Sequence, residues 1–190
     1  MSKVRIATKE DALIIKDIID KGISKDYYSI EDINDYIDDN NKYLLVVASD
    51  EDKPLAAMFC IKGKLKDMCL NEHITYPDPI FSKYNANTET VVYKTASTYK
   101  EVRCKGYVGQ LFEEYNNIFN NTEHEIRIGL AIVLPDGTVP IKKHVDKYGF
   151  KPTKIFEKPW NKIKSYCTYC GNNYCECNGL LYLKEKRVEE

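Results

Sequence analysis

A turn that contains two glycines, just before an amphipathic helix, is the first feature of the sequence that could support chemistry. It lies in the stretch KEVRCKGYVGQLFEEYNNIF, residues 100–119, where Arg103 and Lys105 add basic side chains. Apolar residues follow at helical spacing, namely Val108, Leu111, Phe112, Tyr115, Ile118 and Phe119. A helix start presents unpaired backbone N–H groups and the positive end of the helix dipole, and both attract anions. The stretch therefore predicts either an anion-binding turn or a plain helix start.

A cluster of four cysteines near the C-terminus is the second such feature. The segment YCTYCGNNYCECNG, residues 166–179, contains a Cys-x-x-Cys pair and a Cys-x-Cys pair, formed by Cys167, Cys170, Cys175 and Cys177. Four thiolates make a closed tetrahedral shell for zinc. A polar loop offers no core in which four cysteines would pack, so we expect a structural Zn²⁺ site away from any reacting group. Free or redox-active thiols and another metal are the alternatives.

Length and composition indicate one soluble globular domain over residues 1–190. The net charge is −1 and 43% of the residues are hydrophobic, so no strong field draws the chain to nucleic acid or a membrane. No apolar run approaches the roughly 20 residues of a membrane-spanning helix. The start MSKVRIATKED does not resemble a signal peptide. We therefore expect a cytoplasmic protein whose cysteines stay reduced.

Hydrophobic periodicity and turn residues predict an α/β fold with one mixed sheet. Strands are expected at residues 4–7, 43–50, 54–62, 88–98, 125–135, 152–160 and 179–186. Helices are expected at residues 8–22, 29–40 and 138–149, and within 100–119. Thr8 with Asp11, and Ser29 with Asp32, have the spacing of a capping box at the starts of the first two. Thr138 is expected to cap the last helix and Gly149 to end it. Two insertions interrupt this order: a long polar loop at residues 63–87, and a Cys-rich insert at residues 161–179 between the last two strands.

Two segments resemble motifs of the GNAT superfamily of N-acetyltransferases. RCKGYVG, residues 103–109, is similar to the R-x-x-G-x-G/A loop that binds the acyl-CoA pyrophosphate in that family. KKHVDKYGFKP, residues 142–152, is similar to a family segment with a Gly-Phe pair, matched here by Gly149 and Phe150. The order of predicted elements is also similar. The resemblance implies a single GNAT-like α/β domain with a mostly antiparallel central sheet flanked by helices, and an acetyl-CoA-dependent N-acetyltransferase activity.

The resemblance also implies which residues bind acetyl-CoA. Ala96, Ser97 and Thr98 would pair with the pantetheine arm and donate an N–H to the thioester carbonyl. The pyrophosphate would lie on the loop, which comprises Arg103, Cys104, Lys105, Gly106, Tyr107, Val108 and Gly109. Thr138 would take the place of an asparagine that the family often has early in its last helix.

The expected reaction is attack by an amine on the acetyl thioester. An amine with a pKa of about 10.4 is neutral in only about 1 in 2,500 molecules at pH 7, so a base that removes its proton accelerates attack. In the family that the chain resembles, a tyrosine often protonates the leaving thiolate, and Val145 occupies its position in this chain. His144 and Tyr148 are candidate replacements, with a solvated surface histidine and a core tyrosine as the alternatives. Glu89 is the candidate base, with an exposed carboxylate at a strand start as its alternative.

Other residues give weaker indications. Glu72 and His73, in the polar loop, are further candidates for the base. The acidic helix at residues 29–40 either attracts a cationic amine or is a solvated face.

The sequence leaves the acceptor open. It predicts acetyl-CoA as donor partner and a primary amine of a small molecule, peptide or protein as acceptor. A homodimer is compatible with it, and neither a membrane nor nucleic acid is expected as a partner. The alternative function is a catalytically inactive GNAT-fold binding or regulatory module with a structural zinc site, which Val108 and Val145 favour.

Overall fold

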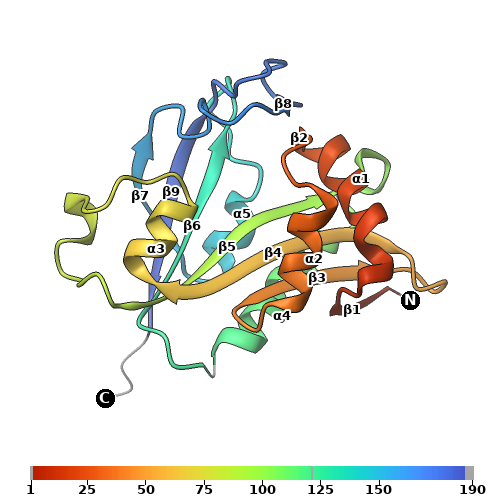
Figure 1. The fold of residues 1–190 in the computed structure, drawn as a ribbon, viewed down its shortest axis with the longest axis horizontal. Helices are drawn as coiled ribbons and strands as arrows, with labels where there is room; N and C mark the ends of the chain where they lie inside the picture. The colour runs from red at the N-terminus through yellow and green to blue at the C-terminus, as the bar shows by residue number, and fades with distance from the viewer. Residues whose placement is uncertain (1, 121, 187–190) are drawn as a thin grey trace.

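A seven-stranded mixed sheet forms the centre of the computed structural model, which describes residues 2–120 and 122–186 (Figure 1). Across the sheet the strands are β1 (Lys3–Ile6), β3 (Lys42–Ala48), β4 (Pro54–Lys64), β5 (Glu89–Thr98), β6 (Ile126–Val133), β9 (Asn178–Glu185) and β7 (Lys151–Phe156). Among the strands of this sheet in the described residues, β5 and β6 form the one parallel pair. The predicted α/β fold with a mostly antiparallel sheet is therefore confirmed. No helix in the described ranges is long and apolar enough to cross a membrane.

Helices cover both faces of the sheet because its strands alternate their apolar side chains. Leu44 and Val46 of β3 pack under α1 (Ala12–Gly22) and α2 (Ile30–Asp38). Their neighbours Leu45 and Val47 face the opposite core, which lies under α4 (Tyr107–Asn120) and α5 (Lys142–Lys147). The predicted capping boxes at the starts of the first two helical regions are present, at Thr8 and at Ser29.

The start of α5 differs from the prediction. The helix begins at Lys142, and its N-cap is Ile141 rather than Thr138. The Thr138 hydroxyl instead donates to the Asp136 carboxylate at 2.7 Å, because the two residues close a turn after β6. Gly149 ends the helix with a φ of 79°, as predicted.

The segment predicted as a long polar loop is more ordered than expected. It contains the helix α3 (Leu65–Asn71) and a short 3₁₀ turn at Pro79–Phe81. Leu65, Met68 and Cys69 lie at helical spacing and are buried in a third cluster with Val92 and Ile128. Seven helical residues within a polar segment carry too weak a periodicity to be recognised before the sheet under them is known.

The sheet divides between β5 and β6. Thr90, Val91 and Val92 pair with Ile126, Arg127 and Ile128, and beyond these residues the two strands diverge (Figure 1). A bulge at Lys94 bends β5, since Thr95 lies opposite Phe59 while Tyr93 lies opposite Cys60.

A tyrosine ring fills the base of this fork. A Cβ at Gly129 would lie 2.1 Å from the Tyr93 ring, so glycine is required there. The Tyr93 hydroxyl donates to the Gly129 carbonyl at 3.3 Å. The ring therefore keeps the two strands apart where their ladder ends.

A buried arginine fastens α4 to β6 behind the fork. Arg127 is 3% exposed, and its guanidinium donates to Asn116, Asn120 and the His124 Nε2 atom at 2.9–3.0 Å. In the described chain no carboxylate pairs with it. His124 must stay neutral to accept this hydrogen bond, and burial together with the Arg127 charge lowers its pKa to about 4.

This contact makes folding acid-sensitive. In the unfolded chain His124 takes up a proton below its ordinary pKa of 6.5, whereas in the folded chain it does so only near pH 4. Stability should therefore fall as the pH drops from about 6.5 to about 4, by roughly 1–3 kcal/mol from this residue. His124→Gln keeps an acceptor for Arg127 and should flatten the decrease. Urea unfolding at pH 7 and pH 5 checks this, and an unchanged pH dependence in the variant would contradict it.

Candidate functional site

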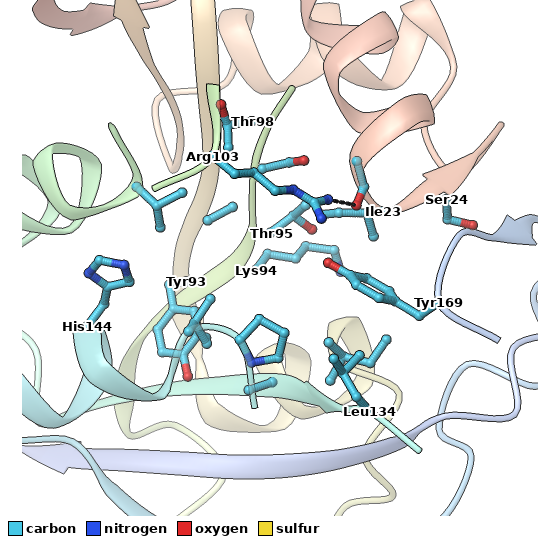
Figure 2. A pocket seen from close by; sticks show the side chains of 18 of the residues that line it. Ile23, Ser24, Tyr93, Lys94, Thr95, Thr98, Arg103, Leu134, His144 and Tyr169 are labelled. Carbon is cyan, nitrogen blue, oxygen red and sulfur yellow. Dashed lines mark hydrogen bonds between the residues drawn. The ribbon is translucent and has the colours of Figure 1, made fainter. Parts of the chain in front are cut away.

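A cavity of about 530 Å³ opens at the fork between β5 and β6 (Figure 2). Two groups of residues distant in sequence line it. One side consists of predicted acetyl-CoA residues, namely Ala96, Ser97, Thr98, Arg103, Cys104, Gly106, Tyr107, Val108 and Thr138, together with His144. The other side consists of residues after α1, the bulge residue Lys94, and the Cys-rich insert. Lys105 and Gly109 belong to the same loop but do not line the cavity.

The glycine-containing loop offers free backbone donors. The Val102 and Arg103 N–H groups bond to Tyr99 and Lys100, and the Gln110 N–H bonds to Gly106. Between them, the N–H groups of residues 104–109 have no acceptor in the described part of the chain. Cys104 and Gly106 have φ values of 64° and 84°, which turn the backbone into α4. Such a run of open N–H groups at a helix start suits a phosphate.

The Arg103 side chain lines the cavity and bonds to the end of α1. Its guanidinium donates to the Gly22 carbonyl at the end of α1, at 3.3 Å, and so spans the cavity mouth (Figure 2).

His144 is the predicted catalytic residue that the structure brings to the cavity. Its ring stacks on Phe112 with a centroid distance of 5.8 Å and an interplanar angle of 7°. Burial lowers its pKa from 6.5, and the nearby charges of Lys143 and Lys147 act in the same direction. The imidazole is therefore neutral at pH 7. Among the described residues that line the cavity it is the only imidazole, and none is a carboxylate.

Two other predicted catalytic residues lie outside the cavity. Glu89 is at the far end of β5, where it pairs with Lys64 and lines a separate depression, so its assignment as base is wrong. The Tyr148 ring packs against the core beside Phe112, and its hydroxyl is buried without a hydrogen-bond partner in the described chain. Glu89 is excluded by the length of β5, which separates it from the cavity, and Tyr148 by the direction of its side chain.

Lys94 is a cavity residue that sequence reasoning missed. It is the extra residue of the β5 bulge, and its ammonium donates to the Asn71 carbonyl at 2.6 Å and to Glu72 at 3.3 Å. Burial raises the pKa of Glu72, although Lys94 and the Leu130 N–H oppose this. Glu72 therefore lies behind Lys94 as a buried counter-ion and not on the cavity wall.

The charges on the wall are positive. Lys94, Arg103 and Lys143 line the cavity. From the acidic helix α2, Asp32 borders only a neighbouring depression. The expectation that this helix attracts a cationic amine thus finds no support in the cavity itself.

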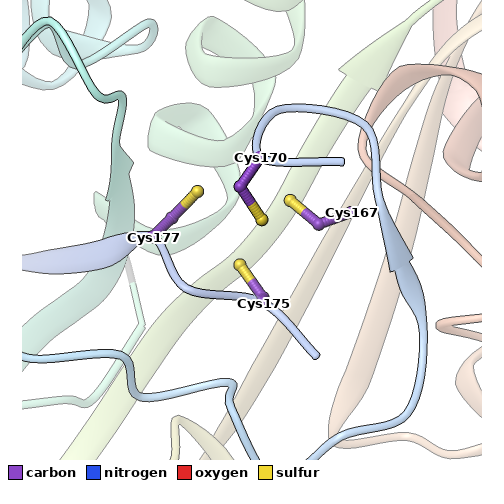
Figure 3. Close-up of side chains that lie close together, drawn as sticks. All are labelled: Cys167, Cys170, Cys175 and Cys177. Atoms are coloured by element: carbon purple, nitrogen blue, oxygen red, sulfur yellow. The ribbon is translucent and has the colours of Figure 1, made fainter. Parts of the chain in front are cut away.

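The four cysteines of the insert converge (Figure 3). Their sulfur atoms lie within 4.8 Å of one another, and a tetrahedral zinc shell with bonds of about 2.3 Å needs separations of about 3.8 Å. Cys167, Cys175 and Cys177 are buried and Cys170 is half-buried. A hydrogen bond with the Cys175 thiol lowers the pKa of Cys167 to about 5. Burial opposes this shift, and the Cys170 and Tyr169 N–H groups favour it. The cluster can hold a metal ion.

The position of the cluster differs from the prediction. Cys167 and Cys175 line the cavity itself, so the site is not remote from the acetyl-CoA residues. The predicted insert lies between β7 and β9 in sequence, but its tip folds back across the sheet toward α1 (Figure 1). No local pattern in the sequence predicts that contact.

Comparisons with known proteins give matches in structure only. Neither a scan of family models nor a search of curated sequences finds a match. Arabidopsis thaliana NAA60, solved with acetyl-CoA, has a TM-score of 0.69 and 11% identity over 97% of this chain and 98% of its own. Escherichia coli ribosomal-protein-S18-alanine N-acetyltransferase has a TM-score of 0.66 and 7% identity over 100% of this chain and 97% of its own.

A third similar structure is of a protein whose description names the GNAT family. It is a Desulfovibrio desulfuricans protein described as an acetyltransferase of the GNAT family, with a TM-score of 0.61 and 11% identity over 98% of this chain and 100% of its own. At such identities a likeness shows the fold alone. Together with the divided sheet and the loop before α4, these matches show that the chain has the fold of the GNAT N-acetyltransferases.

Proposed function

We propose that the protein is an acetyl-CoA-dependent N-acetyltransferase in which an amine attacks the thioester directly. The observation that carries the proposal is the cavity at the β5–β6 fork, which is lined by a loop of open N–H groups and also by the aromatic residues Tyr27, Trp160 and Tyr169. The GNAT fold of the chain supports the same reading, and several proteins with that fold are N-acetyltransferases by title.

The donor would occupy the side formed by β5, α4 and α5. Residues 104–109 would hold the pyrophosphate through their free N–H groups. Beyond Val92, β5 no longer pairs with β6, so the edge of β5 that faces β6 is open. The pantetheine arm would lie along this edge at Ala96–Thr98 and pair with it as an added strand. A backbone N–H there would stabilise the oxyanion of the thioester carbonyl.

The chemistry requires one proton to leave the amine and one to reach the thiolate. The amine nitrogen forms a bond to the carbonyl carbon, the C–S bond breaks, and CoA leaves as a thiolate. His144 is the group we assign to proton transfer, directly or through water, because its neutral imidazole lines the cavity. The cavity tyrosines Tyr27, Tyr93 and Tyr169 are poor bases, because burial raises their pKa values.

The acceptor is a primary amine of a small molecule or of a peptide. Structures with this fold include a phosphinothricin N-acetyltransferase and the NatC complex bound to a Gag peptide, so the fold accommodates both classes. The absence of a carboxylate among the described lining residues disfavours acceptors that carry several positive charges, such as polyamines.

The proposal includes a structural Zn²⁺ ion held by Cys167, Cys170, Cys175 and Cys177. Four thiolates close the coordination shell, so the ion would have no open position for water or substrate. Its role would be to order the insert, because the binding free energy of a structural zinc is folding free energy.

The alternative function, a binding module without catalysis, is favoured by one observation. Val145 occupies the position of the family's usual acid and is fully buried in the core. The two functions differ in whether acetyl-CoA is consumed. A thioester that stays intact in the presence of a broad panel of amines and peptides would favour the binding module.

The donor site is tested with a matched pair of glycine variants. Gly106 and Gly137 both have positive φ values and open space where a Cβ would lie, but only Gly106 lines the cavity. Gly106→Trp should weaken acetyl-CoA binding by about 10–100-fold, because the indole would displace the phosphate from its N–H donors. Gly137→Trp should bind acetyl-CoA as the wild type does. Calorimetry checks both, and equal affinities for all three proteins would contradict the assignment.

The role of His144 is tested against Tyr148. His144→Gln should lower turnover by about 10²–10⁴-fold, whereas Tyr148→Phe should leave it unchanged because the hydroxyl lies outside the cavity. The neutral imidazole is the active form and its pKa lies below 6.5, so wild-type turnover should be constant above that pH and fall below it. The histidine variant should lose this inflection. Loss of turnover in Tyr148→Phe alone would reverse the assignment.

The metal is tested by elemental analysis of protein purified without added metal. We expect about one zinc per chain and four cysteines that resist thiol reagents until the metal is chelated. Zinc near zero, with the four thiols freely reactive in the native protein, would rule out the site.

A further inference from the structure

The Cys-rich insert has little regular structure of its own. Between β7 and β9 it contains the two-residue strand β8 (Tyr166–Cys167) and an isolated bridge between Lys164 and Tyr174. The hydrophobic residues that pack against the cysteine cluster are Ile132, Trp160 and Tyr169. So short a segment has no core that would hold it in one conformation, and the sulfur cluster is its centre.

The insert bonds to the segment that follows α1. β8 pairs antiparallel with β2 (Ser24–Lys25), and Cys167 lies opposite Ser24. The Thr168 N–H donates to the Ile23 carbonyl at 2.9 Å, and its hydroxyl donates to the same oxygen at 2.8 Å. The Ser24 hydroxyl donates to the Ser165 hydroxyl at 2.9 Å. All these contacts are within two residues of the metal ligand Cys167.

The joined segments form one wall of the cavity. From the insert, Trp160, Ser165, Cys167, Tyr169 and Cys175 line it. From the segment after α1, Ile23, Ser24 and Tyr27 line it. The opposite wall, where we place acetyl-CoA, takes no residue from the insert. The Gly22 carbonyl links the two walls, because it accepts from Arg103 at 3.3 Å and from Thr168 at 3.4 Å. A second link is the hydrogen bond of 3.1 Å between the hydroxyls of Tyr28 and Thr95.

We propose that the metal held by the four cysteines builds the acceptor wall, so that binding of the acceptor depends on the metal and binding of acetyl-CoA does not. Without the metal the insert loses its centre, β8 leaves β2, and Ile23 and Ser24 lose their partners in the insert. The proposal rests on the proposed transferase function, which determines which wall binds acetyl-CoA and which wall binds the acceptor. The coupling between the metal and residues 22–28 is independent of that function.

The test uses zinc itself as the probe. Trp160 is the single tryptophan of the chain, and it touches both the cluster and the cavity, so its fluorescence reports on the insert. The holo-protein is titrated with a chelator and then with Zn²⁺, while hydrogen exchange is measured for residues 22–28, 165–176 and 104–112. We expect chelation to redshift the Trp160 emission and to accelerate exchange at least about 10-fold in the first two segments only. Zinc should restore both.

Acetyl-CoA affinity is measured on the same samples. The dissociation constant should stay within about 3-fold on chelation, because the donor wall has its own supports in β5, α4 and α5. If an acceptor is identified, its KM should rise at least about 10-fold on chelation.

Three variants of the insert complete the experiment. Cys170→Ser should behave as the chelated protein. Cys170→His should retain zinc and the protected segments, since three cysteines and one histidine also form a structural zinc shell and this position is half-buried. Glu176→Gln, an exposed side chain between two of the cysteines, should match the wild type. Chelation makes the test independent of whether Cys170→Ser folds.

Two results would overturn the proposal. One is acceleration confined to residues 165–176 while residues 22–28 stay protected, which would mean that the metal orders only its own loop. The other is a loss of acetyl-CoA affinity in proportion to zinc loss. Failure of the zinc-loaded protein to bind acetyl-CoA would instead contradict the proposed function and leave the coupling standing.

Discussion

The division of the sheet between β5 and β6 is the constraint on which the rest of the structure depends. Two parallel strands pair over three residues and then separate, held apart by the Tyr93 ring over Gly129. An open strand edge inside a fold is costly unless something pairs with it. Here the open edge leads directly to the start of α4, whose N–H groups are also free. The fold thus maintains a line of unsatisfied donors that an extended ligand with a phosphate end can satisfy.

The two walls of the cavity are stabilised in different ways. The wall where we place acetyl-CoA is formed by long elements with their own hydrophobic core, in which Phe112, Val145 and Phe150 are fully or almost fully buried. The wall where we place the acceptor is formed by short segments, a two-residue strand and a turn after α1, which are joined by a few hydrogen bonds. This difference in stabilisation explains why a metal would be needed on one side of the cavity only. Regions with few buried apolar contacts are the ones whose local stability a single ligand can set.

The sequence predicted the elements well where periodicity was long and the caps were explicit. The capping box at Ser29, the alternating apolar strands and the Gly149 terminus are all local signals, and the structure confirms them. The sequence did not predict the features that depend on tertiary contacts. The bulge that places Lys94 in the cavity depends on register against β4, and the helix α3 depends on the sheet beneath it.

The catalytic candidates show the same limit. Glu89 was close to the loop in sequence but lies at the opposite end of β5, because one strand of ten residues separates them by its full length. Tyr148 caps the end of α5 one turn after His144, yet of these two residues only His144 lines the cavity. The approach of the cysteine cluster to α1 joins residues more than 140 positions apart, for which the sequence contains no signal.

The central claim is that acetyl-CoA lies in the fork with its pyrophosphate on the loop before α4. Backbone amide shifts measured by ¹⁵N NMR during an acetyl-CoA titration test it most directly. The account predicts saturable shifts concentrated at residues 96–98 and 104–109, with little change at residues 22–28 and 165–176. Shifts concentrated away from the fork, or none at a saturating concentration of acetyl-CoA, would contradict it.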